Sequence, residues 1–596
     1  MLRLLAFLAV LSAALVGVVV SDRPLPPAEL VYADLQPAFT LDPQRMSYEQ
    51  DFRLAYALYE GLLRWDNDTF EPQPAAAAAW TVSDDRLVYT FTIRDDARWS
   101  TGDPVRAQDF VYAWTRAVLP DTAADYTQLL FFIDGGEDLF AWRTAQLAEY
   151  AERPARERTP SAAAEADAEL DAYAAGQFGV RALDERTLEI RLERPTPFFL
   201  DLLCFATFMP VHPPTVEAYT PIDPATARRQ LRPGWTKPGA HVGNGPYVLT
   251  RWRFKRDMRM EANPMYAGAA APRSASIEVR TIEDPATAVL AFETGAIDWL
   301  TDVTVDYLPD LVEAQNDGRR DDVRWFPNFG TYFWNFNCTP TFTDGRANPL
   351  YDPRVRRALA LATDKNAIVT SVRRAGEPAA FTLIPPGSLG AFDAAGRVKG
   401  LRYDPDAARA LLREAGWEDR DGDGVIESSA GRAFPVIELL CTTGSYHDSV
   451  AQAMQSMWER ELGVRSAVRI KETKTYRDDL KRKDYMMARG GWFGDYGDPT
   501  TFLALHRTGD GNNDRGYSDP AYDELYDRAM SEPDPDERVR LFLEAERYTM
   551  EESLPVLPIF TYVQFYLADS SLEGLSVHPR KQQYLFELFV DRGGDE

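Results

Sequence analysis

The sequence predicts a mixed α/β protein with at least two lobes, and three observations support this expectation. The chain has 596 residues, whereas one domain typically has about 100–200. Hydrophobic residues make up 45% and aromatic residues 12% of the chain, which supplies enough apolar side chain for sizeable cores. Segments with strand-like alternation are interspersed with segments of helical periodicity along the chain. No internal repeat of about 20–50 residues is visible.

The chain is strongly acidic. Its 65 Lys and Arg residues against 92 Asp and Glu residues give a formal net charge of -27. Such a field repels nucleic acid and anionic membranes and attracts cationic ligands, although solubility is its more general consequence. The arginine runs are short, so we expect no nucleic-acid partner. Cys204, Cys338 and Cys441 are widely separated without metal-site spacing, and we expect them to be small core residues.

Residues 1–23 are expected to form a signal peptide or an N-terminal membrane anchor. One positive charge, Arg3, precedes an apolar run from Leu4 to Val20, as in secretory signals. No small-x-small cleavage site precedes Ser21, and about 17 apolar residues can just span a bilayer, so an uncleaved tether is an alternative. No cysteine lies near this junction, which excludes a lipoprotein anchor. The remainder is expected to lie in the periplasm or another extracytoplasmic space, secreted or anchored by this segment.

The first half of the chain alternates between strand and helix patterns. A short strand at 29–32 precedes a helix at 48–63, which Gly61 is expected to stop. Alternation then predicts a strand at 87–94, followed after a turn by a helix at 108–118. The next expected elements are an exposed helical insertion broken by prolines at 142–176, a hairpin-like pair at 179–183 and 187–192, and a glycine-proline turn feeding a strand at 243–249.

Helices dominate the second half. Residues 330–337 alternate as in a strand, but the longer patterns are helical. The elements expected there are a helix and strand at 288–299, an amphipathic helix at 355–365, a helix at 403–417 with Gly416 as its stop, a charged helical region at 520–553 and a strand at 555–560.

The most informative stretch is 489–501, which reads Arg-Gly-Gly-Trp-Phe-Gly-Asp-Tyr-Gly-Asp-Pro-Thr-Thr. It sets the carboxylate of Asp495 among aromatic residues and glycines, with Arg489 six residues upstream. Aromatic walls and close-approach glycines can grip a main chain or an amine, and a desolvated carboxylate is a natural partner for an ammonium group. An Asp in such a loop is otherwise most often a turn residue or a helix cap. The stretch therefore predicts a site for a positively charged amino group.

The chain resembles the family-5 extracytoplasmic solute-binding proteins, the oligopeptide and dipeptide receptors of ABC importers. Residues 489–496 match their Arg-x-Gly-Trp-x-x-Asp-Tyr element. The family's N-terminal signature is present in the same order and at similar spacing, from Leu-Asp-Pro at 41–43 through Tyr-Thr-Phe-Thr-Ile-Arg at 89–94. Gly-x-Gly-Pro-Tyr at 243–247 is a further family element. The resemblance extends over nearly the whole chain except the insertion at 142–176.

This resemblance implies the type II fold of periplasmic binding proteins, with two α/β lobes, a hinge, a ligand cleft and an extra α/β domain. The expected division places lobe one at 24–59, 208–329 and 560–596, the extra domain at 60–207, and lobe two at 330–559. It also implies a peptide ligand and the membrane permease subunits of an ABC importer as partners. We further expect a monomer and no cofactor.

The resemblance assigns roles to residues of the 489–496 element. The family's Asp at the position of Asp495 holds the ammonium of the peptide N-terminus. Gly491, Trp492 and Phe493 would meet the peptide main chain in β-fashion and wall its first side chain. Arg489 matches a position that is a candidate for the ligand's C-terminal carboxylate.

Further pocket residues follow from the same resemblance. His447 lies where related receptors use a histidine near the C-termini of longer ligands, although a lone His is more often a surface or packing residue. Tyr126 and the aromatic cluster Tyr332, Phe333 and Trp334 fall where the family lines its pocket. Because the cluster also alternates like an ordinary strand, we expect about half of its aromatic residues to be core.

The chain departs from the family pattern in two places. Some oligopeptide receptors supply a Glu and a Val to the ligand where this chain has Ser47 and Glu49. Some relatives carry a disulfide between the positions of Gly330 and Phe493, and neither is Cys here. That crosslink is therefore absent.

A partial calcium motif occurs at 419–427. Asp419, Asp421 and Asp423 match positions 1, 3 and 5 of an EF-hand loop, but the twelfth residue is Ala430 instead of Glu. Asp/Gly turns are common without metal, so this is a weak Ca²⁺ candidate and no metal is expected. Catalysis is not expected either, because the chain has no Gly-x-Ser-x-Gly, no His-Glu-x-x-His and no Cys-His constellation.

Three functional hypotheses follow. The first is a receptor that captures oligopeptides and delivers them to an ABC importer. The second keeps the fold but binds a non-peptide solute such as a sugar, an opine or a nickel chelate; Asp495 and Arg489 favour a zwitterionic peptide instead. The third is an envelope enzyme or a membrane-tethered peptide sensor, and a hydrolase would need a nucleophile or metal that the sequence lacks.

Overall fold

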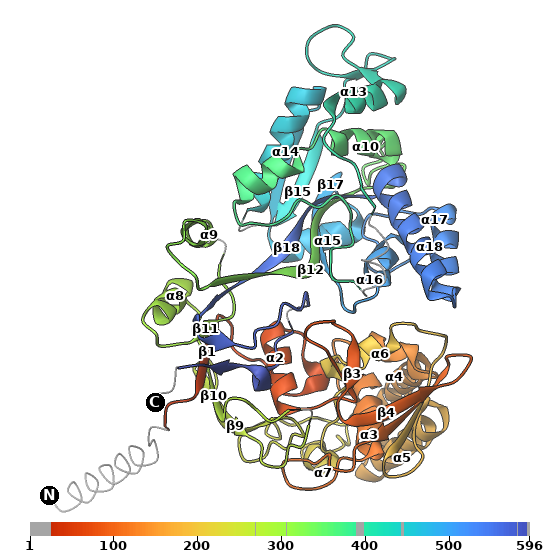
Figure 1. The fold of residues 1–596 in the computed structure, drawn as a ribbon. Helices are drawn as coiled ribbons and strands as arrows, with labels where there is room; N and C mark the ends of the chain where they lie inside the picture. The colour runs from red at the N-terminus through yellow and green to blue at the C-terminus, as the bar shows by residue number, and fades with distance from the viewer. Residues whose placement is uncertain are drawn as a thin grey trace, which may run out of the picture.

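The computed structural model describes residues 26–268, 270–304, 307–388, 398–442, 446–580 and 582–592. Figure 1 shows a lower body, built mainly from the first part of the chain, and an upper body, built from the later part. The signal peptide or anchor expected at 1–23 lies outside the described residues. Within the described residues, no helix combines the length and the apolar character needed to cross a membrane.

A ten-stranded mixed sheet runs through both bodies. Its central strands, β12 (Val323–Phe336) and β18 (Val556–Ala568), are long antiparallel partners that extend from the lower body into the upper one (Figure 1). Their register shifts between Pro327 and Thr331, near the middle of the pair. A change of twist at this irregularity would rotate one body against the other. In sheet order the strands are β16 (Ser466–Lys471), β15 (Ile437–Thr442), β17 (Met487–Phe493), β12, β18, β11 (Trp299–Leu300), β1 (Leu30–Asp34), β10 (Ser276–Thr281), β9 (Asp257–Ala262) and β8 (Tyr247–Arg253).

The lower body adds a second, four-stranded sheet and a group of helices. The sheet order is β4 (Ala77–Val82), β5 (Val88–Ile93), β7 (Thr187–Arg191) and β6 (Val180–Ala182). Leu58 and Tyr247, from the expected lobe one, belong to the same hydrophobic cluster as Phe110 and Leu188, from the expected extra domain. The two regions therefore share one core. The helices of this body are α2 (Glu49–Leu58), α3 (Ala107–Val118), α4 (Gly136–Glu152), α5 (Pro160–Gln177), α6 (Phe199–Leu202) and α7 (Pro213–Glu217). Two more helices, α8 (Pro285–Glu293) and α9 (Leu308–Asn316), lie beside the strands that connect the two bodies (Figure 1).

The upper body has its own core. Trp458 is fully buried there, and its indole N–H donates to the Leu359 carbonyl (3.0 Å), which joins two helices. Cys204, Cys338 and Cys441 are buried free cysteines, as expected. The main helices are α10 (Pro353–Leu361), α13 (Pro405–Glu414), α14 (His447–Leu462), α15 (Thr473–Arg482), α16 (Thr500–Leu503), α17 (Pro520–Ser531) and α18 (Pro535–Arg547).

One helix ends earlier than its sequence pattern predicts. The helix expected at 48–63 with Gly61 as its stop ends at Leu58. The N–H of Gly245 donates to the Leu58 carbonyl (3.1 Å), and a Cβ on Gly245 would lie 2.5 Å from that carbonyl carbon. The glycine-proline turn thus packs against the helix end. This tertiary contact overrides the local periodicity.

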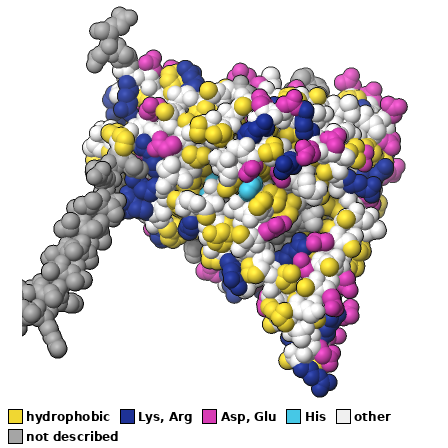
Figure 2. Space-filling view, turned by 90° about the horizontal axis from the view of Figure 1, so that it is seen from below, with side chains coloured by type: hydrophobic (Ala, Val, Ile, Leu, Met, Phe, Trp, Pro, Cys, Tyr) yellow, Lys and Arg dark blue, Asp and Glu magenta, His cyan; other side chains and the backbone are white. Residues whose placement is uncertain are grey.

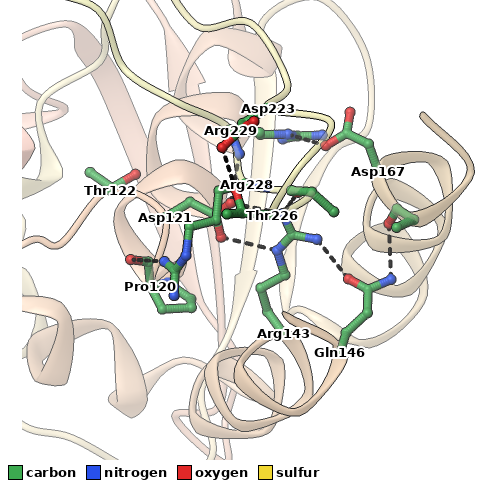
Figure 3. Close-up of polar contacts among 12 residues, drawn as sticks. Pro120, Asp121, Thr122, Arg143, Gln146, Asp167, Asp223, Thr226, Arg228 and Arg229 are labelled. Atoms are coloured by element: carbon green, nitrogen blue, oxygen red, sulfur yellow. Dashed lines mark hydrogen bonds and ion pairs between the residues drawn. The ribbon is translucent and has the colours of Figure 1, made fainter. Parts of the chain in front are cut away.

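The insertion at 142–176 forms a helical hairpin of α4 and α5. A buried arginine of α4 binds it to the rest of the lower body. Arg143 of α4 is 0% exposed. Its Nε and Nη2 donate to the two carboxylate oxygens of Asp121 at 3.0 and 2.7 Å (Figure 3). Arg229 reaches across to Asp167 of α5 (2.7 Å) in the same view. The hairpin is exposed on its outside, as expected, but anchored through both helices.

Replacing Arg143 with Ala should lower the free energy of unfolding by about 3–5 kcal/mol, because it leaves the Asp121 carboxylate buried without its partner. Urea unfolding followed by circular dichroism measures this change. Arg156→Ala, in an ion pair whose side chains are 85% and 54% exposed, is the matched control and should cost less than about 1 kcal/mol. Equal costs for the two variants would contradict the anchoring role of Arg143.

Candidate functional site in the interlobe cleft

Strand β17 has a free edge over most of its length. On one side it pairs throughout with β12, but on the other side β15 pairs only with Met487 and Ala488. Beyond them the Tyr476 hydroxyl donates to the Arg489 carbonyl. No strand of the described residues pairs with that side of residues 490–492. An extended peptide can therefore add to this edge by main-chain hydrogen bonds.

Glycines on and beside β17 make room for aromatic rings. Phe493 stacks on Tyr562 with ring centroids 4.6 Å apart and remains 49% exposed. Its ring covers its cross-strand partner Gly330, where a Cβ would lie 2.4 Å from the Phe493 Cδ1. A Cβ on Gly491 would lie 2.6 Å from the Tyr562 hydroxyl oxygen. The Phe493 ring thus fills the space that a side chain at Gly330 would need.

Asp495 follows β17 and lines the cleft, and no cation of the described residues pairs with it. Its backbone N–H donates to Thr501 Oγ1 (3.2 Å), which holds the turn. Burial raises the pKa of the Asp495 carboxyl to about 6, and no neighbouring cation among the described residues offsets this effect. A carboxylate that is partly withdrawn from water gains from a nearby cation, so the site is suited to one that a ligand supplies.

Asp495 lines a cavity of about 310 Å³ to which both bodies contribute. Tyr126 faces it from the lower body, where burial and then the charge of Asp495 raise the pKa of the Tyr126 hydroxyl to about 12. Phe493 faces it from the upper body. The full lining is Ser47, Glu49, Phe52, Arg53, Tyr56, Trp65, Tyr126, Phe205, Asn328, Phe329, Phe493, Gly494, Asp495, Arg580, Gln582 and Gln583.

The loop after Asp495 reaches the lower body although it belongs to the upper one. The Gly497 N–H donates to Asp201 Oδ2 of α6 (2.8 Å). The ring of Tyr496 lies parallel to that of Phe198, with centroids 4.3 Å apart. Asp201 lies on α6 and Gly497 comes shortly before α16, and Figure 1 shows these two helices facing each other between the two bodies. The two bodies therefore touch at a second place besides the two long strands.

The carboxylate of Asp201 also fixes part of the cavity wall. Arg580 donates to both of its oxygens (2.7 and 2.8 Å), and the Trp65 indole N–H donates to Oδ1 (2.6 Å). The Arg580 guanidinium carbon lies 4.2 Å from the centroid of the Trp65 ring. One carboxylate, whose side chain is 2% exposed, thus joins the C-terminal segment, strand β2 (Leu63–Trp65) and the Asp495 loop.

A second unpaired charge lies on β17 itself. The Arg489 Nη2 donates to the Tyr562 hydroxyl (3.4 Å), and its guanidinium carbon is 5.4 Å from the centroid of the Tyr332 ring. His447 Nδ1 lies 3.3 Å from the Tyr332 hydroxyl oxygen. Burial, with Arg489 and Arg373 nearby, lowers the pKa of His447 to about 4, so it is neutral at pH 7. No carboxylate of the described residues shifts the pKa of Arg489, and the cluster can accept an anionic group.

Some residues singled out in the sequence lie away from the cavity. Phe333 and Trp334 are buried in the core of the upper body. Asp419, Asp421 and Asp423 lie on an exposed loop, with carboxylate oxygens within 4.8 Å of one another. Exposed acidic turns of this kind are common without a metal, and these residues carry no proposal here.

Most of the cavity wall was not found from the sequence. Glu49, Phe52, Arg53 and Tyr56 all line the cavity and lie on one face of α2, at positions i, i+3, i+4 and i+7. The sequence signal that could have identified these residues is a predicted helix with aromatic and charged residues on the same face. Trp65, Phe205 and Arg580 come from distant segments and offered no local signal.

The fold and the cleft together define an α/β binding protein whose ligand site lies between two hinged lobes. The profile described as bacterial extracellular solute-binding proteins, family 5 Middle, matches residues 71–514, which is more than half of the chain. The chain belongs to family 5 of the bacterial extracellular solute-binding proteins.

Relatives and solved structures cover almost the whole chain. The oligopeptide-binding protein OppA of Bacillus subtilis is 31% identical over 523 residues, 87% of this chain and 84% of that protein. The periplasmic oligopeptide-binding protein OppA of Salmonella typhimurium is 29% identical over 92% of this chain and 90% of its own. The unliganded open form of the murein tripeptide-binding protein MppA superposes with a TM-score of 0.74 at 26% identity, covering 95% of this chain and 98% of the other. The expected type II periplasmic-binding-protein fold is confirmed.

A peptide-bound structure is also similar. Haemophilus influenzae OppA in complex with RPPGFSPFR has a TM-score of 0.66 at 25% identity, covering 95% of this chain and 99% of the other. The TM-score to the unliganded open form is higher.

Proposed function

We propose that this protein is an extracytoplasmic receptor that captures oligopeptides in its cleft and delivers them to an ABC importer without chemical change. The observation that carries the proposal is the partly buried carboxylate of Asp495, which has no cation within the described part of the chain. The N-terminal ammonium of a peptide is a cation of the right kind. Two relatives are named as oligopeptide-binding proteins, and one neighbouring structure holds a nine-residue peptide.

The binding site would use Asp495, Arg489 and the edge of strand β17. Asp495 takes the peptide ammonium, and the edge at Gly491, Trp492 and Phe493 takes the main chain. Arg489 takes the C-terminal carboxylate of peptides long enough to reach it. The other contributing residues are Tyr126, His447 and Tyr332.

The wider role follows from the family. The partners would be the membrane permease subunits of the importer, and the receptor would act as a monomer in the periplasm or another extracytoplasmic space. Lobe one would comprise 24–59, 208–329 and 560–596, the extra domain 60–207 and lobe two 330–559. Nucleic acid is not a proposed partner, because the net charge is -27 and acidic and apolar side chains separate the basic ones on the face in Figure 2.

A thermal-shift screen of the purified protein against pooled di- to hexapeptides, sugars and nickel tests the proposal. A peptide at about 100 times its dissociation constant should add about 2.7 kcal/mol to the free energy of unfolding and raise the midpoint visibly. Acetylation of the peptide N-terminus should remove the shift. A response to sugars or nickel alone would overturn the peptide assignment while keeping the fold.

A further inference from the structure

A second cavity lies on the lower body, next to the cleft cavity and almost separate from it. Its volume is about 440 Å³, and residues 39–51 and 231–237 supply most of its wall. Ser47 is the one described residue that lines both this cavity and the cleft cavity. None of the residues assigned above to peptide binding lines it. We call it the side cavity.

Three basic side chains on the wall of the side cavity have no acidic partner. Arg45, Arg232 and Lys237 line the cavity and are exposed. None of the ion pairs among the described residues includes any of these three. The Lys237 Nζ instead lies 3.9 Å from the centroid of the Trp252 ring. In a chain whose net charge is -27, basic groups gathered on one cavity wall without a counter-charge favour the binding of an anion.

The carboxylates on the same wall cancel only part of this positive charge. Asp42 is 1% exposed and accepts hydrogen bonds on both oxygens from the Arg116 guanidinium, which compensates its charge. Burial raises the pKa of Asp51 to about 7, so a large part of this carboxyl is uncharged at pH 7. Asp125 is exposed and forms no ion pair within the described part of the chain. The wall therefore has an excess of about one to two positive charges.

Two exposed aromatic rings line the side cavity as well. Phe39 and Tyr48 pack on each other with ring centroids 4.7 Å apart, and they remain 51% and 53% exposed. Ligand pockets typically combine aromatic walls with a few charged groups. The two rings offer apolar surface for the body of a ligand, while the basic side chains offer partners for its charge.

We propose that the side cavity is a second binding site, for a phosphate monoester whose organic group is a sugar or another ring. A phosphate monoester carries a charge of about −1.5 to −2 at pH 7, which matches the excess positive charge of the wall. Two guanidinium groups and one ammonium group are suited to its oxygens, and the rings of Phe39 and Tyr48 would cover its organic group. This site is independent of peptide binding, so its failure would leave the proposed function standing.

The test is isothermal titration calorimetry of the whole protein without peptide, at low ionic strength, with glucose 6-phosphate, glucose and inorganic phosphate. Glucose 6-phosphate should bind about tenfold or more tightly than inorganic phosphate, because only the sugar phosphate contacts the rings as well as the basic groups. Glucose should bind about 100-fold more weakly than its phosphate, and added salt should weaken the phosphate ligands by screening. Equal affinities for glucose and glucose 6-phosphate, or no binding of any probe, would overturn the inference. Inorganic phosphate that bound as tightly as the sugar phosphate would reduce the site to an adventitious ion only.

Two variants place the ligand in the side cavity. Arg232→Gln should weaken the binding of glucose 6-phosphate about tenfold, because it removes one charged partner of the phosphate. Arg477→Gln is the matched control, since Arg477 of α15 in the upper body is also an exposed arginine without an ion pair among the described residues. Tyr48→Ala should weaken the binding of glucose 6-phosphate and leave that of inorganic phosphate unchanged, a pattern that an unstable variant would not give. Equal affinities in the two arginine variants would exclude the side cavity as the binding site.

Discussion

Asp495→Asn should weaken peptide binding by about 30- to 1,000-fold, the loss typical when one partner of a buried charged pair is removed. The substitution keeps the shape of the side chain but removes the charge that would hold the ligand ammonium. Calorimetric titration with a peptide that stabilises the parent protein measures the effect. Asp125→Asn, an exposed carboxylate next to Tyr126, is the matched control for net charge and should bind normally.

The same substitution should stabilise the ligand-free protein. Burial raises the pKa of the Asp495 carboxyl from 3.8 to about 6, so the folded chain binds this proton more tightly than the unfolded chain. The carboxyl therefore makes no contribution to stability below about pH 4 and an unfavourable one above about pH 6. At pH 8, Asn should raise the free energy of unfolding by about 1–3 kcal/mol. A destabilised, ligand-free Asp495→Asn protein would contradict an unpaired carboxylate at this position.

The second large effect is on the pH dependence of binding. The ligand ammonium needs the ionised carboxylate, and ionisation of Asp495 is lost below a pKa of about 6. Affinity should therefore fall about tenfold per pH unit below 6 and again above about pH 8, where the peptide amine loses its proton. His447, whose pKa burial lowers to about 4, stays neutral above pH 5 and does not contribute there.

Titrations from pH 4.5 to 9 measure this profile. Asp495→Asn provides the control. Its residual affinity should no longer fall below pH 6 but should still fall above about pH 8. A parent protein whose affinity is constant from pH 5 to 7 would exclude Asp495 as the ammonium partner.

Local features of the sequence were sufficient to predict the strands, most helices and the Asp495 loop. The glycines and aromatics of 489–496 lie close together in the chain, so their chemistry was visible without a structure. The early end of α2 at Leu58 was not visible, because Gly245 causes it from a distant turn. The position of Arg580 in the cavity wall could not be predicted either, because it also depends on segments that are distant in the chain. Arg580 reaches the cavity only because the C-terminal segment folds back onto the lower body.

The buried Asp201 illustrates what sequence reasoning cannot supply. An Asp in a short helix is usually a capping or surface residue. Its function here depends on Arg580, Trp65 and Gly497, which come from three other parts of the chain. Only the assembled fold brings these groups to one carboxylate.

The contact between Asp201 and Gly497 has a kinetic consequence. This hydrogen bond joins the lower body to the Asp495 loop, so we expect peptide entry to require that it first opens. The observed association rate should therefore stop rising at high peptide concentration and reach a plateau equal to the opening rate. Asp201→Asn should raise that plateau in stopped-flow measurements. A rate that stayed proportional to peptide concentration would show that ligand entry proceeds without this gate.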